Sequence, residues 1–184
     1  HILPFREHLK LEDYFALFGC AAATSDAVTG QERALVAQLR LLEGNAWSSV
    51  HLKSGESVMG EYDAILIHHY RCFAFECKRL REGRQEGTAK RFPGDRTRQE
   101  KHGDIRMDLL KLYQIRQHFS GPFGRSYWVF GGDYQLSPQE LEMLKLFDVT
   151  LVSESQARNL SRHAAALGLP PAGAKTSTSG LTRR

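Results

Sequence analysis

Cysteine is scarce in this sequence, and long apolar runs and internal repeats are missing from it. The three cysteines, Cys20, Cys72 and Cys77, are an odd number, and no two have zinc-finger spacing. We therefore expect reduced thiols in a cytoplasmic protein. No apolar run approaches the length needed to cross a membrane, and no segment resembles a signal peptide. These absences argue against a disulfide scaffold and against a membrane protein.

Charged residues of both signs are present, with a small basic excess. The 184 residues carry a formal net charge of +4, and the sequence pI is about 9.1. Such an excess suits polyanionic partners but does not by itself select them. Hydrophobic residues make up 41% and charged residues 25%, which is ordinary for a globular protein. The length allows one domain with a full hydrophobic core.

Composition divides the chain into three segments. Residues 1–25 look like an appended segment, in which a short apolar helix precedes a connector over residues 20–26. Residues 26–167 carry the regular hydrophobic patterns of one domain. Residues 168–184 are small, polar and basic, and we expect them to be disordered. The sequence begins with His rather than Met, which is consistent with a fragment of a longer protein.

The central segment alternates between strand and helix patterns. The patterns predict a helix over 30–42, strands over 47–53, 61–68 and 70–77, a helix from residue 105, a strand over 126–130, a helix over 137–147 and a strand over 149–153. Residues 79–103 are polar, basic and rich in glycine, and read as a long loop or mobile lid. The order α-β-β-β-α-β-α-β predicts an α/β (α+β) fold with a mixed central sheet flanked by helices.

Two of the predicted strands carry charge where a buried strand should be apolar. Asp63 opens the apolar run 64–67, and Glu76 and Lys78 close the apolar run 72–75. A tight hairpin between the strands makes them antiparallel, so Asp63 pairs with roughly position 76. Glu76 and Lys78 point to the same face of the sheet. We expect that face to be open and the opposite, aromatic face to be core.

Paired carboxylates at this place favour a divalent cation. Two close carboxylates repel each other unless a cation lies between them. Oxygen ligands suit Mg²⁺ or Mn²⁺. Lys78 could then orient a water or stabilise charge on a phosphate. The alternative is a surface salt bridge between Glu76 and Lys78, which contributes roughly 0–1 kcal/mol but leaves the position of Asp63 unexplained.

This arrangement resembles the PD-(D/E)XK nuclease superfamily. The matching residues are Asp63 and Glu76-Cys77-Lys78, in a restriction-endonuclease-like αβββαβ order. The resemblance implies a metal-dependent endonuclease that hydrolyses phosphodiester bonds and commonly works as a dimer. It implies Asp63, Glu76 and the backbone carbonyl of Cys77 as ligands of Mg²⁺ or Mn²⁺, and Lys78 as the residue that activates water.

Residues 30–153 are similar to a more specific group, the C-terminal nuclease module of CRISPR-associated ancillary nucleases. The similarity rests on Glu61-Tyr62-Asp63, on Lys111-Leu112 and on the turn over 121–124. In that family an N-terminal sensor (the CARF domain) binds a cyclic oligoadenylate and switches on the nuclease. The resemblance implies a role in antiviral defence. The chain departs from the family by lacking a sensor and by its insertion over 79–103.

Further residues could support such a site. Glu32, at the start of the first domain helix, is either an additional metal or water ligand or an acid stabilised by the helix dipole; Glu12 is a poorer candidate. Basic residues beyond the site either track nucleic-acid phosphates or belong to a solvated loop. The candidates for nucleic-acid binding are Arg79, Arg81, Arg98, Lys101 and, on the outer face of its helix near the sheet, Lys111.

Two other readings stay open. The chain could be a nucleic-acid-binding module on a catalytically inactive nuclease fold, although the intact Asp63, Glu76 and Lys78 argue against decay. It could also be a restriction or repair endonuclease that acts alone. His68 and His69 are interpreted as an exposed turn pair rather than as metal ligands.

Overall fold

The computed structural model describes residues 9–81 and 97–173. Their regular elements follow one another in an order that contains the predicted one. In chain order they are α1 (Leu11–Ala16), β1 (Cys20–Thr24), α2 (Gly30–Leu39), β2 (Asn45–Ser54), β3 (Ser57–His68), β4 (Arg71–Leu80), α3 (Arg98–His118), β5 (Phe123–Gly132), α4 (Pro138–Leu146), β6 (Val149–Ser153), α5 (Glu154–Ala157) and α6 (Leu160–Leu167). From α2 to β6 the predicted α-β-β-β-α-β-α-β order is confirmed.

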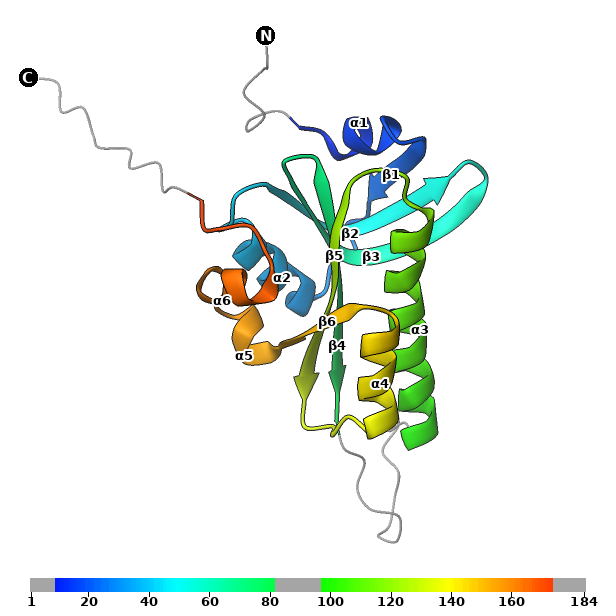
Figure 1. Cartoon of the computed structure of the whole chain (residues 1–184), viewed down its shortest axis with the longest axis vertical. Helices are drawn as coiled ribbons and strands as arrows, with labels where there is room; N and C mark the ends of the chain where they lie inside the picture. Colours follow the sequence, from blue (N-terminus) through cyan, green and yellow to red (C-terminus); the bar gives the residue numbers. More distant parts are fainter. Residues whose placement is uncertain (1–8, 82–96, 174–184) are drawn as a thin grey trace, which may run out of the picture.

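The sheet is six-stranded, with the strands in sequence order from β1 to β6. Neighbours from β1 to β4 run antiparallel, whereas β4, β5 and β6 run parallel. The parallel pairs are connected through α3 and α4, as parallel strands require. Figure 1 shows α3 and α4 on one side of the sheet and α2, α5 and α6 on the other. The predicted α+β fold with a mixed sheet and flanking helices is confirmed.

Each face of the sheet carries its own hydrophobic core. On one face the stripe of α3, which includes Leu109 and Leu112, packs with Ala74 of β4 and Trp128 of β5. On the other face α2 and α6 pack over the aromatic residues of β4 and β5. The expectation that the face of Ala74, Glu76 and Lys78 stays open is therefore wrong. The apolar stripe of α3 needs a partner, and this face of the sheet provides it.

The N-terminal segment is integrated into the same core. Tyr14 and Phe15 of α1 are buried with the α3 side of the sheet. The predicted connector is wrong for its first five residues, since Cys20–Thr24 form β1 and pair with β2. The sequence of this alanine-rich strand lacks the alternation that identifies a strand. It is a strand because backbone hydrogen bonds to β2 hold it at the edge of the sheet.

Two predicted irregular segments are partly regular. β4 continues to Leu80, and α3 begins at Arg98, where Thr97 and Glu100 form a capping box; the rest of the expected loop, 82–96, lies outside the described residues. The predicted disorder over 168–184 is wrong for its first part, because Leu169 is buried and Ala172 bridges to Leu42. Residues 174–184 lie outside the described residues. Among the described helices, none is long and apolar enough to cross a membrane.

Candidate active site

The candidate site lies where β3 and β4 separate. Their ladder ends at the pair Ala64 and Phe75, whereas β4 continues beside β5 as far as Leu80. The next residues of the two strands are Asp63 and Glu76, so the ladder stops just short of the predicted pair, and the pairing of these two acids stays a prediction. We call this point the β3–β4 fork. Two polar residues can occupy it because the backbone of β4 has lost its neighbour on that side.

The fork coincides with a change in which side chains face which core. On β3, Tyr62 and Ile65 lie in the same core although they are three residues apart, and on β2 Val50 lies in that core with Trp47 packed against it. Strict alternation would place such residues on opposite faces. The backbone of Ser49, which lies between them on β2, has a φ of 49°. Asp63 lies at this break, between Tyr62 of one core and Ala64 of the other.

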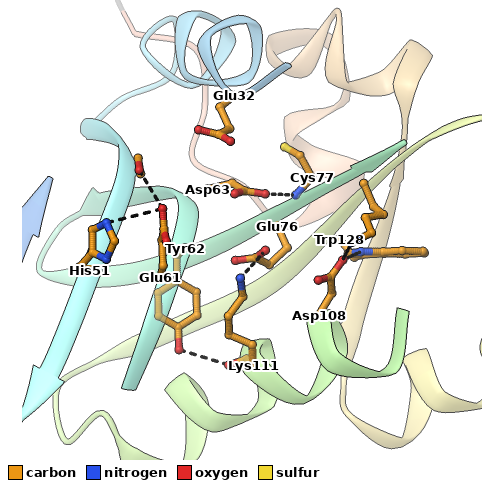
Figure 2. Close-up of polar contacts among 12 residues, drawn as sticks. Glu32, His51, Glu61, Tyr62, Asp63, Glu76, Cys77, Asp108, Lys111 and Trp128 are labelled. Carbon is orange, nitrogen blue, oxygen red and sulfur yellow. Dashed lines mark hydrogen bonds and ion pairs between the residues drawn. The ribbon is translucent and has the colours of Figure 1, made fainter. Parts of the chain in front are cut away.

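Asp63 replaces the strand partner that β4 lost. Its Oδ2 accepts a hydrogen bond from the backbone N–H of Cys77 at 2.6 Å. Burial raises the pKa of Asp63, this hydrogen bond lowers it, and the carboxylate of Glu32 raises it again, for a net increase. Figure 2 shows Glu32 of α2 directed toward Asp63 from the α2 side of the sheet.

Glu32 also takes part in the N-cap of its helix. Its backbone N–H donates to Thr29 Oγ1 at 3.2 Å, and the Thr29 hydroxyl donates to Glu32 Oε1 at 3.0 Å. The side chain is nevertheless buried and faces a second carboxylate. Both interpretations of Glu32 are therefore compatible with its placement: it lies in the first turn of α2, bonded to the N-cap Thr29, and stands beside the fork. Glu12 is exposed on α1.

Glu76 is the most deeply buried acid of the fork, with a relative exposure of 3%. Its Oε2 lies 2.8 Å from Lys111 Nζ, and its Oε1 is buried without a hydrogen-bond partner among the described residues. Burial, followed by the carboxylate of Asp63, raises the pKa of Glu76 well above its usual range, although Lys111 acts in the opposite direction. An orphaned carboxylate oxygen in a buried site is what a bound cation would satisfy.

Lys111 approaches the fork from α3. Its predicted position on the outer face of the helix is wrong, since the side chain points inward to Glu76 (Figure 2). The stem passes Gly60, whose φ is +138° and where an added Cβ would lie 3.2 Å from Lys111 Cγ. Tyr62 fixes the strand beneath the helix by donating its hydroxyl to the carbonyl of Lys111 at 3.2 Å.

Lys78 lies on the same face as Glu76 and is held by an acid that the sequence reading missed. Its ammonium is 3.6 Å from Asp108 Oδ2, and the indole Nε1–H of Trp128 donates to the same oxygen at 3.3 Å. Burial raises the pKa of Asp108, and Lys78 lowers it, for a net increase. Asp108 lies three residues before Lys111 on a helix, a spacing that places both on one face and could have identified it.

The acids of the fork fit a hard divalent cation such as Mg²⁺ or Mn²⁺. Asp63, Glu76 and the nearby Glu32 offer only oxygen atoms, which these ions prefer. In the structure Asp63 accepts a backbone hydrogen bond and Glu76 pairs with Lys111. Among the described residues, the one group of three ligand atoms within 4.8 Å of one another is not at the fork; it consists of Glu43, His68 and His69. A cation bound through Oε2 of Glu76 would displace Lys111 from that oxygen.

The predicted nucleic-acid-binding residues separate into two groups. Arg79 points to the opposite face from Lys78, lies 3.9 Å from Glu154 and lines a cavity of about 380 Å³ beside α2 and α5. Lys101 is buried rather than on an open loop, and its ammonium donates to the carbonyl of Arg81. Arg98 stacks over the ring of Tyr134 at 5.5 Å. Only Lys111 reaches the fork among these five.

Glu61, the first acid of the Glu-x-Asp pattern, lies apart from the fork. It accepts a hydrogen bond from the hydroxyl of Ser49 at 3.1 Å and lies 3.5 Å from His51 Nε2. Figure 2 shows it on the β2 side, separate from Glu76.

No protein-family model matches the sequence, and no curated protein matches it significantly. Solved structures that resemble the fold include the following two. Protein VC1899 from Vibrio cholerae is 15% identical with a TM-score of 0.45, over 78% of this chain and 33% of that one. Can2 from Sulfobacillus thermosulfidooxidans, solved with cyclic tetra-adenylate, is 15% identical with a TM-score of 0.46, over 71% and 34%. The chain thus spans about a third of either protein, and identity this low concerns the fold alone.

Proposed function

We propose that this chain is a divalent-metal-dependent endonuclease that hydrolyses phosphodiester bonds of nucleic acid. The observation that carries the proposal is the β3–β4 fork. It brings Asp63 and the buried Glu76 together with two lysines, Lys78 and Lys111, on the side covered by α3. Carboxylates for a cation beside ammonium groups for a phosphate are the requirements of metal-assisted phosphodiester cleavage.

Each residue of the fork has a different role in the proposed reaction. Asp63 and Glu76 would hold Mg²⁺ or Mn²⁺, with the carbonyl of Cys77 as a further oxygen ligand. Such an ion, when bound, lowers the pKa of its water and offsets charge on the phosphate. Lys78 orients the attacking water or stabilises charge that builds on the phosphate. Asp108 touches no reacting atom and acts by positioning the Lys78 ammonium, 3.6 Å away.

Lys111 has two roles in this scheme. It neutralises Glu76 while the cation is away, which makes burial of the carboxylate tolerable. Once released from Glu76, its ammonium remains on the fork side of α3, where it can contact a substrate phosphate. This keeps the sequence prediction that Lys111 is a phosphate contact and adds a reason for its inward position.

The proposal extends to the protein that would carry this chain. On the sequence resemblance, the chain is the effector domain of a cytoplasmic, cyclic-oligonucleotide-activated CRISPR defence protein that works as a homodimer. A sensor of the CARF kind would precede it in that protein. A cyclic tetra-adenylate is what Can2 binds in its solved structure, and a cyclic oligoadenylate is the activator we propose here.

Cleavage assays with the Lys78→Ala variant test the proposal. The purified chain is incubated with single-stranded DNA, duplex DNA and RNA, each with Mn²⁺, Mg²⁺ or EDTA, at low and high protein concentration. We expect cleavage only with metal, and a fall of orders of magnitude in Lys78→Ala. Binding should change little, because one lysine contributes about one unit to the salt slope of affinity.

The same assay distinguishes a nuclease from a module that only binds nucleic acid. Tight, salt-sensitive binding without cleavage under either metal, at high protein concentration as well, would contradict the nuclease and favour an inactive scaffold that binds nucleic acid. An exposed lysine serves as the matched control: Lys53→Ala on β2 removes the same charge outside the fork and should cleave like the wild type.

A further inference from the structure

A second cluster of metal-binding side chains lies at the other end of β3. Glu43 belongs to the segment between α2 and β2, His68 is the last residue of β3, and His69 begins the turn to β4. Among the residues that the structure describes, these three form the one group of His, Cys, Asp or Glu whose ligand atoms lie within 4.8 Å of one another. His68 and Asp63 are five residues apart on β3, about 16 Å, so the cluster is separate from the fork.

The three side chains already face one another. His68 Nε2 lies 3.3 Å from Glu43 Oε2. The rings of His68 and His69 are stacked, with centroids 3.9 Å apart and planes inclined by 23°. The stacked rings lie side by side, and binding of a shared ion would turn them so that one nitrogen of each converges on it. We propose that Glu43, His68 and His69 form a binding site for Zn²⁺.

The backbone holds these ligands in place before an ion arrives. The N–H of Glu43 donates to the carbonyl of Pro171 at 2.8 Å. Gly44, with a φ of +122°, lets this segment approach the end of β3, because an added Cβ would lie 2.5 Å from the carbonyl oxygen of Ile67. A site whose backbone is fixed beforehand loses less entropy on binding.

The turn that carries His69 is equally constrained. His69 and Tyr70 have φ values of 48° and 61°, a left-handed conformation that non-glycine residues adopt at a cost. The hydroxyl of buried Tyr14 donates to the carbonyl of Tyr70 at 2.6 Å. The core therefore holds the turn in the conformation that stacks His69 on His68.

The donor set selects the kind of metal. Two imidazoles and a carboxylate, with one position left for water, are a common tetrahedral Zn²⁺ set, whereas Mg²⁺ prefers oxygen alone. Ligand atoms around a tetrahedral zinc are roughly 3.4 Å apart, given bond lengths of about 2.1 Å. Closing to this spacing from 4.8 Å or less needs the ligand atoms to approach one another by up to about 1.4 Å.

An ion pair between Glu43 and His68 is the simpler explanation of the cluster. It accounts for two of the three residues, whose side chains are 24% and 17% exposed, but not for His69. The two explanations differ in what His69 does. A metal site needs the imidazole of His69, whereas the ion pair does not.

Calorimetric titration with Zn²⁺ tests the site directly. The wild type is compared with His69→Asn, which tolerates a left-handed backbone, and with Glu43→Gln. His118→Asn, an exposed histidine at the end of α3, and Cys77→Ser are matched controls for other histidines and for thiols. We expect one tight Zn²⁺ equivalent in the wild type and both controls, and an affinity at least about a hundredfold lower in His69→Asn and Glu43→Gln.

A thermal melt gives a second readout that does not depend on cleavage. Saturating Zn²⁺ should raise the melting temperature of the wild type by about 5 °C and leave that of His69→Asn unchanged. Absence of Zn²⁺ binding to the wild type would overturn the site, as would equal affinity in His69→Asn or loss of binding in Cys77→Ser. None of these outcomes bears on cleavage at the fork.

Discussion

At the scale of single residues, the fork places a buried carboxylate against a lysine. Glu76 pairs through one oxygen with Lys111, and its other oxygen has no partner in the part of the chain that the structure describes. A buried ion pair of this kind adds little stability, since desolvation offsets the attraction. In the proposed site, the lysine occupies a Glu76 oxygen through which a cation would bind.

On that proposal Lys111 competes with the metal, and its removal should strengthen metal binding. We expect Lys111→Met to bind Mn²⁺ about tenfold more tightly than the wild type, equivalent to ~1.4 kcal/mol. Calorimetry in a His69→Asn background measures this without interference from the Glu43, His68 and His69 cluster. The exposed Lys53→Met on β2 is the matched control. Equal affinity of Lys111→Met and the wild type would show that the lysine does not occupy the cation position.

At the scale of elements, local patterns predicted the strands from β2 to β6 and the approximate register of β3 with β4, whereas tertiary packing decided the rest. The short hairpin allowed the pairing of Asp63 with Glu76 to be counted from the turn. The packing of α3 on the face of the sheet that carries Ala74, Glu76 and Lys78 depends on contacts between residues distant in sequence. So do the burial of Lys101 and the approach of Asp108 to Lys78. A single sequence carries no direct record of such contacts.

The capping box of helix α4, formed by Ser137 and Glu140, includes a carboxylate that is buried in the core. Glu140 is 1% exposed; it accepts hydrogen bonds from the hydroxyl of Tyr134 at 2.9 Å and the N–H of Ser137 at 2.8 Å, and lies 3.0 Å from His102 Nδ1. Burial raises the pKa of Glu140, but hydrogen bonds from Ser137, Tyr134 and His102 outweigh it, so the pKa is lowered.

Removing this carboxylate should destabilise the fold. We expect Glu140→Ala to lower the free energy of unfolding by about 3 kcal/mol, measured by urea denaturation at neutral pH. Because the folded pKa lies below the unfolded value, the contribution is complete above about pH 4.3 and decreases as pH falls through the folded pKa. The exposed Glu142→Gln on α4 should show neither effect; equal stability of Glu140→Ala and the wild type would contradict the network.

At the scale of the whole molecule, one sheet carries two cores, and the N-terminal segment is part of one of them. Sequence composition separated residues 1–25 from the rest because their alanine run and short helix show no sheet pattern. The structure shows Phe15 fully buried, with its ring 5.4 Å from that of Phe119 at the end of α3. Long-range aromatic packing of this kind has no local signal.

Truncating Phe15 should therefore affect the stability of the entire fold. We expect Phe15→Ala to cost about 3–5 kcal/mol, while Leu17→Ala, at a residue 67% exposed, changes stability by no more than about 0.5 kcal/mol. Thermal and urea denaturation of both variants measure the difference. Similar stability of the two variants would indicate that α1 is an appended segment, as its composition suggested.

The central claim is that the residues of the β3–β4 fork form a site that cleaves phosphodiester bonds. The most direct test is to measure metal-dependent cleavage by the variants Glu76→Gln and Asp63→Asn. Both variants keep the shape of the side chain and remove one of two crowded charges, so the metal-free melting temperature should stay the same or rise slightly. With Mn²⁺ and the nucleic acid that the wild type cuts, we predict that cleavage falls by orders of magnitude in both. A cleavage rate equal to that of the wild type in either folded variant would contradict the assignment of the site.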